Sequence, residues 1–171
     1  IENDATAAAL GERLYGIGRS LRQFFLVYVG AGLGGGLIID GAPYKGAAGN
    51  AGEFGHIVVE PGGTLCSCGN RGCLERYFSL DAARAALGSD DPAVLDARLD
   101  AGEPEFARWL DGAAARLTTA LVTVENLLDP ETILIGGEVS PALLDAIIAR
   151  LAAMPPSVSA RPGRSVERVQ R

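Results

Sequence analysis

The sequence is poor in the features that would direct it to a membrane or to nucleic acid. No apolar run approaches the roughly 18 residues that a membrane-spanning helix needs, and the first residues show no secretory signal. Positive charge is scarce, because 15 lysines and arginines face 21 acidic residues and leave a net charge of −6. This balance argues against binding nucleic acid or an anionic membrane through bulk charge. We therefore expect no membrane partner.

Glycine and apolar side chains, in contrast, are abundant. Glycine accounts for 23 of the 171 residues, and hydrophobic residues make up 48%, which is typical of a globular domain with a sizeable core. Many glycines lie between Gly30 and Gly72, which suggests a tightly turned backbone that a ligand can approach. Because the chain starts without methionine in a helix-like segment and stops in an alternating stretch, we expect a fragment of a longer protein.

Hydrophobic periodicity and turn residues predict a mixed α/β domain. A short glycine turn is expected to join two antiparallel strands as a hairpin, since so few residues cannot form a parallel crossover. Serines are expected to cap two of the later helices. The expected elements are a helix at 5–15, strands at 24–29 and 37–40 around a glycine turn at 30–36, a strand at 56–60, a helix start at 74–78, a helix after Ser79, a long helix at 105–128, a strand at 132–137, a helix after Ser140 and a strand start at 165–171.

The only histidine and all three cysteines form the pattern H-x9-C-x-C-x4-C, from His56 through Cys66 and Cys68 to Cys73. Zinc prefers four nitrogen and sulfur ligands in a tetrahedron, and three cysteines with one histidine make a closed set. The alternatives are ordinary buried thiols or a disulfide with one spare cysteine. Three cysteines so close together in a polar glycine loop fit zinc better. Since no position stays open for catalysis, the predicted zinc is structural.

Two glutamates lie near the predicted zinc ligands. Glu53 precedes His56 by three residues, and Glu75 follows Cys73 by two. Each is also consistent with a plain solvated carboxylate, and Glu75 with a favourable charge at a helix start. A zinc site would hold both carboxylates toward one region, where together with the imidazole they suit a ligand rich in hydroxyl groups.

Three further segments allow both a structural and a binding interpretation. Asn3 or Asp4 can cap the first helix, and this local role is favoured for Asp4. The glycine stretch 30–36 forms either a plain hairpin turn or a nest of N–H groups for phosphate, although no Walker-type Gly-Lys-Ser/Thr follows it. The segment 133–140 leads from a strand into a helix, at the kind of strand end where ligands bind.

Taken together, these motifs resemble the ROK family of repressors, open reading frames and kinases. The stretch GNAGEFGHIVVEPGGTLCSCGNRGCLERYFS at 49–79 is the most specific part, and ENDATAAALGE, VGAGLGGGLIIDG and DPETILIGGEVS lie in the family's order and spacing. The resemblance implies an actin/hexokinase-like (ribonuclease H-like) α/β fold, with residues 1–171 as a single C-terminal lobe and the N-terminal lobe outside this chain. The lobe would contain a zinc and sugar-binding segment at 49–79, a helical segment at 80–128 and a strand-turn-helix unit at 132–153.

The resemblance also implies roles for individual residues. Asp4 matches the catalytic base that deprotonates the attacking sugar hydroxyl in the kinases. His56 would hold zinc with one ring nitrogen and face the sugar with the other. The matching sugar-binding positions are Asn3, Asp4, Glu53, His56 and Glu75. The matching nucleotide positions are Gly30, Gly32 and Gly34 on the phosphate side and Gly136 and Gly137 on the adenosine side.

Two residues depart from the kinase pattern. Ala31 stands where the kinases usually have a threonine whose hydroxyl meets phosphate, and Glu138 stands where a small residue is usual beside the nucleotide. Alanine donates no side-chain hydrogen bond, and glutamate adds negative charge near an anionic ligand. Both departures weaken the expectation of ATP binding and leave that of sugar binding intact.

These observations predict, first, a zinc-containing sugar-binding effector domain of a ROK transcriptional regulator, which would bind DNA through a domain outside this chain. The alternative is the C-terminal lobe of a kinase that uses ATP and magnesium to phosphorylate glucose, fructose or an N-acetylhexosamine. For both, the resemblance implies a cytoplasmic protein that forms a homodimer.

Overall fold

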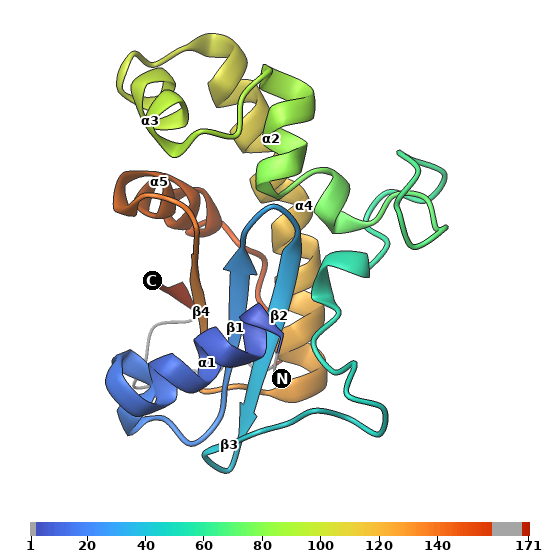
Figure 1. The fold of residues 1–171 in the computed structure, drawn as a ribbon, viewed down its shortest axis with the longest axis vertical. Helices are drawn as coiled ribbons and strands as arrows, with labels where there is room; N and C mark the ends of the chain where they lie inside the picture. The colour runs from blue at the N-terminus through green and yellow to red at the C-terminus, as the bar shows by residue number, and fades with distance from the viewer. Residues whose placement is uncertain (1–2, 159–168) are drawn as a thin grey trace.

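A computed structural model describes residues 3–158 and 169–171, which form a mixed sheet with helices on both faces (Figure 1). The strands are β1 (Phe24–Val29), β2 (Leu33–Ile39), β3 (Ala42–Pro43), β4 (Thr132–Gly137) and β5 (Val169–Gln170). The α-helices are α1 (Asp4–Tyr15), α2 (Leu80–Leu87), α3 (Pro92–Asp100), α4 (Pro104–Leu128) and α5 (Pro141–Leu151). Short 3₁₀ turns lie at Ile17–Ser20, Phe54–His56 and Leu74–Arg76.

The strands follow the order β3-β2-β1-β4-β5 across the sheet. β1 pairs antiparallel with β2, which confirms the expected hairpin, and β1 pairs parallel with β4 after the chain has passed through α2, α3 and α4. Because β1 and β4 run in the same direction, their carboxyl ends lie side by side. The predicted glycine turns after these two strands therefore meet at one edge of the sheet.

Alternating side chains of β1 divide the core into two layers. Phe24 and Leu26 belong to the cluster that packs under α1, whereas Phe25 and Val27 belong to the larger cluster formed with α4 and α5. Figure 1 shows α1 crossing in front of the sheet and α4 running behind it. β1 is thus buried on both faces, which explains why its sequence reads as one apolar run without alternation.

The glycines of β2 make room for α1. A Cβ on Gly36 would lie 2.5 Å from the Cβ of Ala9, and one on Gly34 would lie 2.8 Å from the Cβ of Ala5. The prediction of a glycine turn over 30–36 was therefore too long, because β2 begins at Leu33 and only Gly30 to Gly32 connect the strands. Glycine here serves the close approach of a helix to a strand.

The segment 49–79 contains less regular structure than the sequence suggested. The strand predicted at 56–60 is wrong: His56 ends a 3₁₀ turn, and only Val58 forms an isolated bridge, to Cys73. The helix start predicted at 74–78 is a single 3₁₀ turn, Leu74–Arg76. The run of three β-branched residues at 57–59 imitated a strand, but the chain here follows the turns that bring His56 toward the cysteines.

The helical and C-terminal predictions fared better. Ser79 and Ser140 cap α2 and α5, each accepting a hydrogen bond from a backbone N–H at 3.0 Å. The helical region 80–128 also contains α3, which the sequence analysis did not foresee. Of the strand start predicted at 165–171, Val169–Gln170 form β5, and 165–168 lie outside the described residues.

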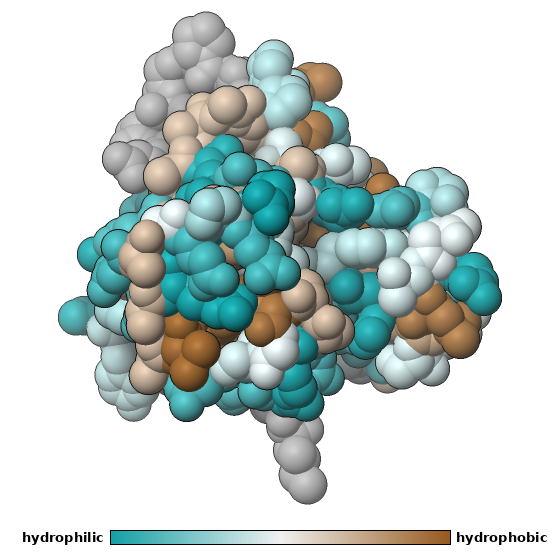
Figure 2. All heavy atoms as spheres, turned by 90° about the horizontal axis from the view of Figure 1, so that it is seen from above, coloured by the Kyte–Doolittle hydropathy of each residue, from teal (hydrophilic) through white to brown (hydrophobic). Residues whose placement is uncertain are grey.

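In the part of the chain described, no helix is both long enough and apolar enough to cross a bilayer. Figure 2 shows the molecule from above, where hydrophilic side chains dominate and apolar ones form small separate patches. Scattered apolar patches of this kind are normal for a globular surface.

Candidate functional site

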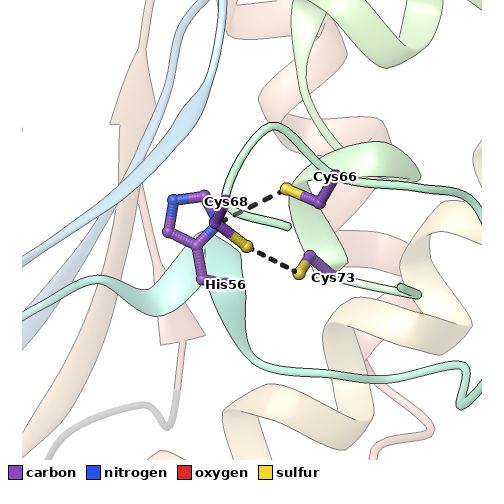
Figure 3. Close-up of side chains that lie close together, drawn as sticks. All are labelled: His56, Cys66, Cys68 and Cys73. Carbon is purple, nitrogen blue, oxygen red and sulfur yellow. Dashed lines mark hydrogen bonds between the residues drawn. The ribbon is translucent and has the colours of Figure 1, made fainter. Parts of the chain in front are cut away.

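His56, Cys66, Cys68 and Cys73 point toward one another from three neighbouring turns (Figure 3). Their ligand atoms all lie within 4.8 Å of one another. The Cys66 Sγ is 3.5 Å from His56 Nδ1, and the Cys68 Sγ is 3.6 Å from the Cys73 Sγ. The structure thus brings together all four residues predicted to hold a metal.

Two of the distances among these four ligand atoms match the edges of a tetrahedral zinc site. With Zn–S bonds of about 2.3 Å and a Zn–N bond of about 2.05 Å, the ion would separate two sulfurs by about 3.8 Å and a sulfur from a nitrogen by about 3.6 Å. The two distances above are close to those edges. The three cysteines are free, and 3.6 Å is far longer than the roughly 2.05 Å of a disulfide bond, so the disulfide alternative finds no support.

Backbone hydrogen bonds and one glycine give the cysteine loop, residues 61–73, its shape. Cys66 N donates to Asn70 O at 2.8 Å, and Gly72 N donates to Thr64 O at the same distance. Gly72 has a φ of +82°, and a Cβ there would lie 1.7 Å from the carbonyl oxygen of Glu60. Only glycine fits this position, which sets Cys73 next to the other ligands.

The thiols influence one another's ionisation. Burial acts to raise the pKa of Cys66, but hydrogen bonds from Cys68, Cys73 and Ser67 outweigh it and lower the pKa to about 7. Burial, followed by the neighbouring thiols, raises the pKa of Cys73 to about 12. Thiols this close resist ionising together, because like charges repel. A bound cation would remove that conflict, so the donor set suits a metal that binds thiolates.

A cavity of about 190 Å³ lies beside this cluster, between α1, the β1–β2 hairpin and the segment 49–79. It collects four of the five residues predicted to bind sugar: Asn3, Asp4, Glu53 and Glu75 line it. Gly32 and Gly34 line it as well. Three carboxylates and an amide around one small cavity offer many hydrogen-bond acceptors for hydroxyl groups.

At the α1 end of the cavity, the structure corrects the prediction that Asp4 caps the first helix. Asn3, not Asp4, caps the helix, because its side-chain oxygen accepts a 2.7 Å hydrogen bond from Thr6 N. Asp4 is the first helical residue, and its carboxylate accepts from Ala5 N at 2.8 Å. The Asp4 carboxylate is therefore not needed as the cap and stands at the rim of the cavity with one oxygen free of intrahelical bonds.

Glu75 is held in place by the hairpin. Its Oε2 accepts a 3.1 Å hydrogen bond from Leu33 N, and a Cβ on Gly32 would lie 2.7 Å from the same oxygen. The absence of a side chain at Gly32 thus admits the Glu75 carboxylate. A phosphate-binding role for Gly32 and Gly34 stays a prediction. Close packing alone explains why both positions are glycine, since a side chain would meet Glu75 at Gly32 and Ala5 at Gly34.

His56 connects the metal ligands to the cavity without lining it. Its Nδ1 faces Cys66, and its Nε2 lies 3.7 Å from the Glu53 carboxylate. Glu53 itself is anchored by its neighbour, because Gly52 O accepts a hydrogen bond from Gly35 N of β2 at 2.8 Å. The two ring nitrogens therefore face different groups, Cys66 and Glu53, and the contact of His56 with zinc and with a sugar stays a prediction.

The other predicted nucleotide residues lie at the adjacent strand ends and outside the cavity lining. Gly136 and Gly137 end β4 opposite Tyr28 and Val29 of β1, and a Cβ on Gly137 would lie 2.1 Å from Val29 O. Gly30 begins the turn after β1. A Cβ on Gly30 would lie 3.2 Å from the Tyr28 ring and 3.8 Å from the Glu138 carboxyl carbon.

Tyr28 is a cavity residue that the sequence analysis missed. It lines the cavity with Asp4, and its hydroxyl donates to Glu138 Oε1 at 3.5 Å. Burial, and then the negative charges of Glu138 and Asp4, raise the pKa of Tyr28. Its position in the sequence could have revealed it. A tyrosine near the carboxyl end of an otherwise apolar strand has a hydroxyl group that needs a hydrogen-bond partner.

Comparison with known proteins decides the family. A family model described as the ROK family matches residues 1–162. The chain belongs to the ROK family. It is 37% identical over 162 residues to a glucokinase of Halalkalibacterium halodurans, covering 83% of this chain and 49% of that protein. It is 32% identical over 158 residues to a xylose repressor of Caldicellulosiruptor bescii, covering 82% of this chain and 40% of the repressor.

Solved ROK structures share the fold. A Streptomyces griseus ROK glucokinase in complex with glucose and AMPPNP superposes with a TM-score of 0.81 at 32% identity, covering 99% of this chain and 61% of that one. A ROK transcriptional regulator, a homolog of the E. coli MLC protein, superposes with a TM-score of 0.72 at 30% identity, covering 99% and 46%. The expected actin/hexokinase-like fold is confirmed. This ROK chain spans about half the length of the curated relatives it matches, which include both kinases and regulators.

Proposed function

We propose that this chain is the sugar-binding half of a ROK transcriptional regulator. The observation that carries the proposal is the cavity in which Asn3, Asp4, Glu53 and Glu75 converge beside His56. Carboxylates accept hydrogen bonds from several hydroxyl groups of one ring, and the asparagine amide can donate one while its oxygen caps α1. A hexose is the ligand class, in keeping with a ROK relative whose structure contains glucose.

Zinc, in this proposal, is held by His56, Cys66, Cys68 and Cys73 and serves as a structural ion. It would stabilise the thiolates and fix the orientation of the histidine ring. With Nδ1 on the metal, the Nε2 proton of His56 would face Glu53, which lies 3.7 Å away. This contact would position the Glu53 carboxylate at the cavity and leave its second oxygen for a sugar hydroxyl.

The regulator is favoured over the kinase by the strand ends next to the cavity. Ala31 offers no hydroxyl to a phosphate group, and the Glu138 carboxylate lies beside Gly30, where the resemblance would place the ATP phosphates. An anionic group at that turn would meet negative charge in place of a hydrogen-bond donor. DNA would be bound by a part of the protein outside this chain, and a cytoplasmic homodimer is the assembly we propose.

The test is a calorimetric titration of the intact protein with a panel of hexoses. We expect one hexose to bind saturably and Glu53→Gln to weaken it at least tenfold, since a charge-assisted hydrogen bond is worth about 1.5–3 kcal/mol. The matched control is Glu105→Gln, which neutralises an exposed glutamate in the first turn of α4, away from the cavity. Unchanged affinity in the Glu53 variant would refute the cavity as the sugar site.

A kinase is the second candidate, and Asp4 is the observation in its favour. The carboxylate stands at the rim of the cavity, where it would accept the proton of an attacking sugar hydroxyl. The glucokinase relatives fit the same interpretation. Release of ADP by the intact protein with ATP, magnesium and a hexose, at a rate of roughly 1–100 per second and abolished in Asp4→Asn, would establish the kinase and refute the regulator.

A further inference from the structure

A second groove, of about 330 Å³, lies outside the sugar cavity, between the cysteine loop, α2 and α4. The loop contributes Thr64, the 3₁₀ turn that follows it contributes Arg76 and the adjoining Tyr77, and α4 contributes Arg108, Trp109 and Arg116. α2 presents a wall of alanines. Glu75 and Arg76 are successive residues of one 3₁₀ turn, yet they line different cavities, Glu75 the one for sugar and Arg76 this groove.

The groove is positively charged in a chain whose net charge is −6. Three arginines and no carboxylate line it among the described residues. Arg116 is paired, since its Nε donates to Glu60 Oε2 at 2.9 Å. Arg76 and Arg108 form no ion pair and no side-chain hydrogen bond within the described part of the chain, which leaves two positive charges uncompensated at the groove.

Arg76 adds the observation that points to a ligand. Its Nε atom is buried and has no hydrogen-bond partner among the described residues. A buried guanidinium N–H without an acceptor loses its hydration and gains nothing in return, so such groups in folded proteins call for a water, ion or ligand. The planar guanidinium offers paired donors that match the oxygens of a phosphate or carboxylate.

The remaining walls suit a ring attached to that anionic group. Trp109 and Tyr77 are both partly buried, and one face of the Tyr77 ring is covered by Arg116 at 4.5 Å. The Trp109 ring packs against Phe106, at 5.8 Å between centroids, and also reaches the groove. A ligand with an apolar ring face would contact tryptophan and alanine while its anionic group meets the arginines, and the volume lies in the range of small-molecule sites.

We propose that this groove binds a small phosphorylated ligand of the sugar phosphate class, with Arg76 and Arg108 on the phosphate and Trp109 against the ring. The site is distinct from the cavity of Asp4 and Glu53 and does not depend on the proposed function of that cavity. It gives this acidic lobe a second ligand, whose anionic group the sugar cavity, with its three carboxylates, would repel.

The experiment is a calorimetric titration of the intact protein with glucose 6-phosphate, with inorganic phosphate and with glucose. We expect glucose 6-phosphate to bind at least tenfold more tightly than phosphate, and each of Arg76→Gln and Arg108→Gln to weaken it about tenfold or more. Arg84→Gln is the matched control, because Arg84 lies on α2 and is paired with Asp81 and Asp90. Its affinity should equal that of the unchanged protein.

Glu53→Gln separates this site from the sugar cavity and should leave the binding of glucose 6-phosphate unaltered. Loss of that binding in the Glu53 variant, or its survival in both arginine variants, would overturn the proposal, as would no saturable binding at all. Inorganic phosphate binding as tightly as the sugar phosphate would overturn the role of Trp109. Because Arg108 is exposed, its variant tests the site even if Arg76→Gln lowers the stability of the fold.

Discussion

The sheet and the segment 49–79 lie against each other but are stabilised in different ways. In β1, every residue except Tyr28 is buried, and two layers of apolar side chains cover the strand. Between 61 and 71, only Cys66 is buried. The sheet therefore owes its stability to the removal of apolar surface from water. The loop has almost no such surface, and its shape depends on turn glycines, backbone hydrogen bonds and the four clustered ligand atoms.

The difference explains where the candidate sites lie. Glu53, Glu75 and Arg76 flank the stretch 61–71, close to the core residues Phe54 and Leu74, and each lines a cavity whose other side comes from the sheet or from α4. A rigid sheet supplies fixed walls, while an irregular loop can direct polar side chains where no regular element would place them. A loop of this kind must be fixed by something other than a core, and the histidine–cysteine cluster is the candidate.

Breaking the cluster should have the largest effect. We expect Cys73→Ser to abolish one equivalent of bound zinc, to lower the stability by several kcal/mol, seen as a fall of roughly 10 °C in Tm, and to abolish sugar binding. Metal analysis, thermal unfolding and titration would measure the three losses. Ser67→Ala, a change on the same loop that removes no ligand, should retain all three properties.

Hydrogen exchange would show whether the cysteine loop and the sheet are stabilised independently of each other. In the Cys73 variant, amides of the cysteine loop should lose protection while those of β1 keep it, because the apolar layers on both faces of β1 remain. Equal loss of protection in both regions would mean that the loop contributes to the core directly. Zinc absent from protein purified without chelator would refute the metal itself.

The stability of the sheet should depend on the packing of α1 against β2, and not on the metal ligands. Gly36→Ala places a Cβ 2.5 Å from that of Ala9, so we expect a loss of about 1–3 kcal/mol as α1 moves away from β2. The same substitution on the helix itself, Gly11→Ala, meets no atom within 4 Å and should stabilise α1 by about 0.5–1 kcal/mol. Chemical denaturation would measure both. A destabilised Gly11 variant, or an unaffected Gly36 variant, would contradict the packing described here.

The same contrast determined what the sequence could predict. β1, β4 and the capped helices α2 and α5 follow from periodicity and cap residues, because local pattern and buried face agree there. The strand predicted at 56–60 failed because its apolar residues are not arranged by a sheet at all. The glycines of β2 suggested a turn, since nothing local to them reveals that Ala5 and Ala9 of α1 pack against them.

The candidate sites divide in the same manner. The metal ligands were predictable, because four residue types with one shared chemistry lie close together in the sequence. Asp4 and Glu53 came to one cavity only through the hairpin between them, and Tyr28 joined them from inside an apolar strand. The groove of Arg76 and Arg108 was not predictable from the sequence, since these two arginines are more than thirty positions apart and arginine on a helix surface is ordinary.

The smallest expected effect concerns an ion pair that ties the loop to a core helix. Arg116 of α4 donates to the Glu60 carboxylate through Nε, at 2.9 Å, and lies over the Tyr77 ring at 4.5 Å. Both contacts are partly exposed, so Arg116→Gln should cost only about 1 kcal/mol in chemical denaturation. The loss should fall on the loop, as lower hydrogen-exchange protection around Glu60 and Tyr77.

Arg150→Gln provides the matched comparison for that change. Arg150 of α5 pairs with Asp111 of α4 at 2.6 Å, between two helices that pack through apolar side chains. Its loss should cost no more than about 0.5–1 kcal/mol and leave the loop amides as protected as before. If both variants instead loosened the loop equally, α4 would be transmitting the change, and the loop would depend on the core helices as well as on its own ligand set.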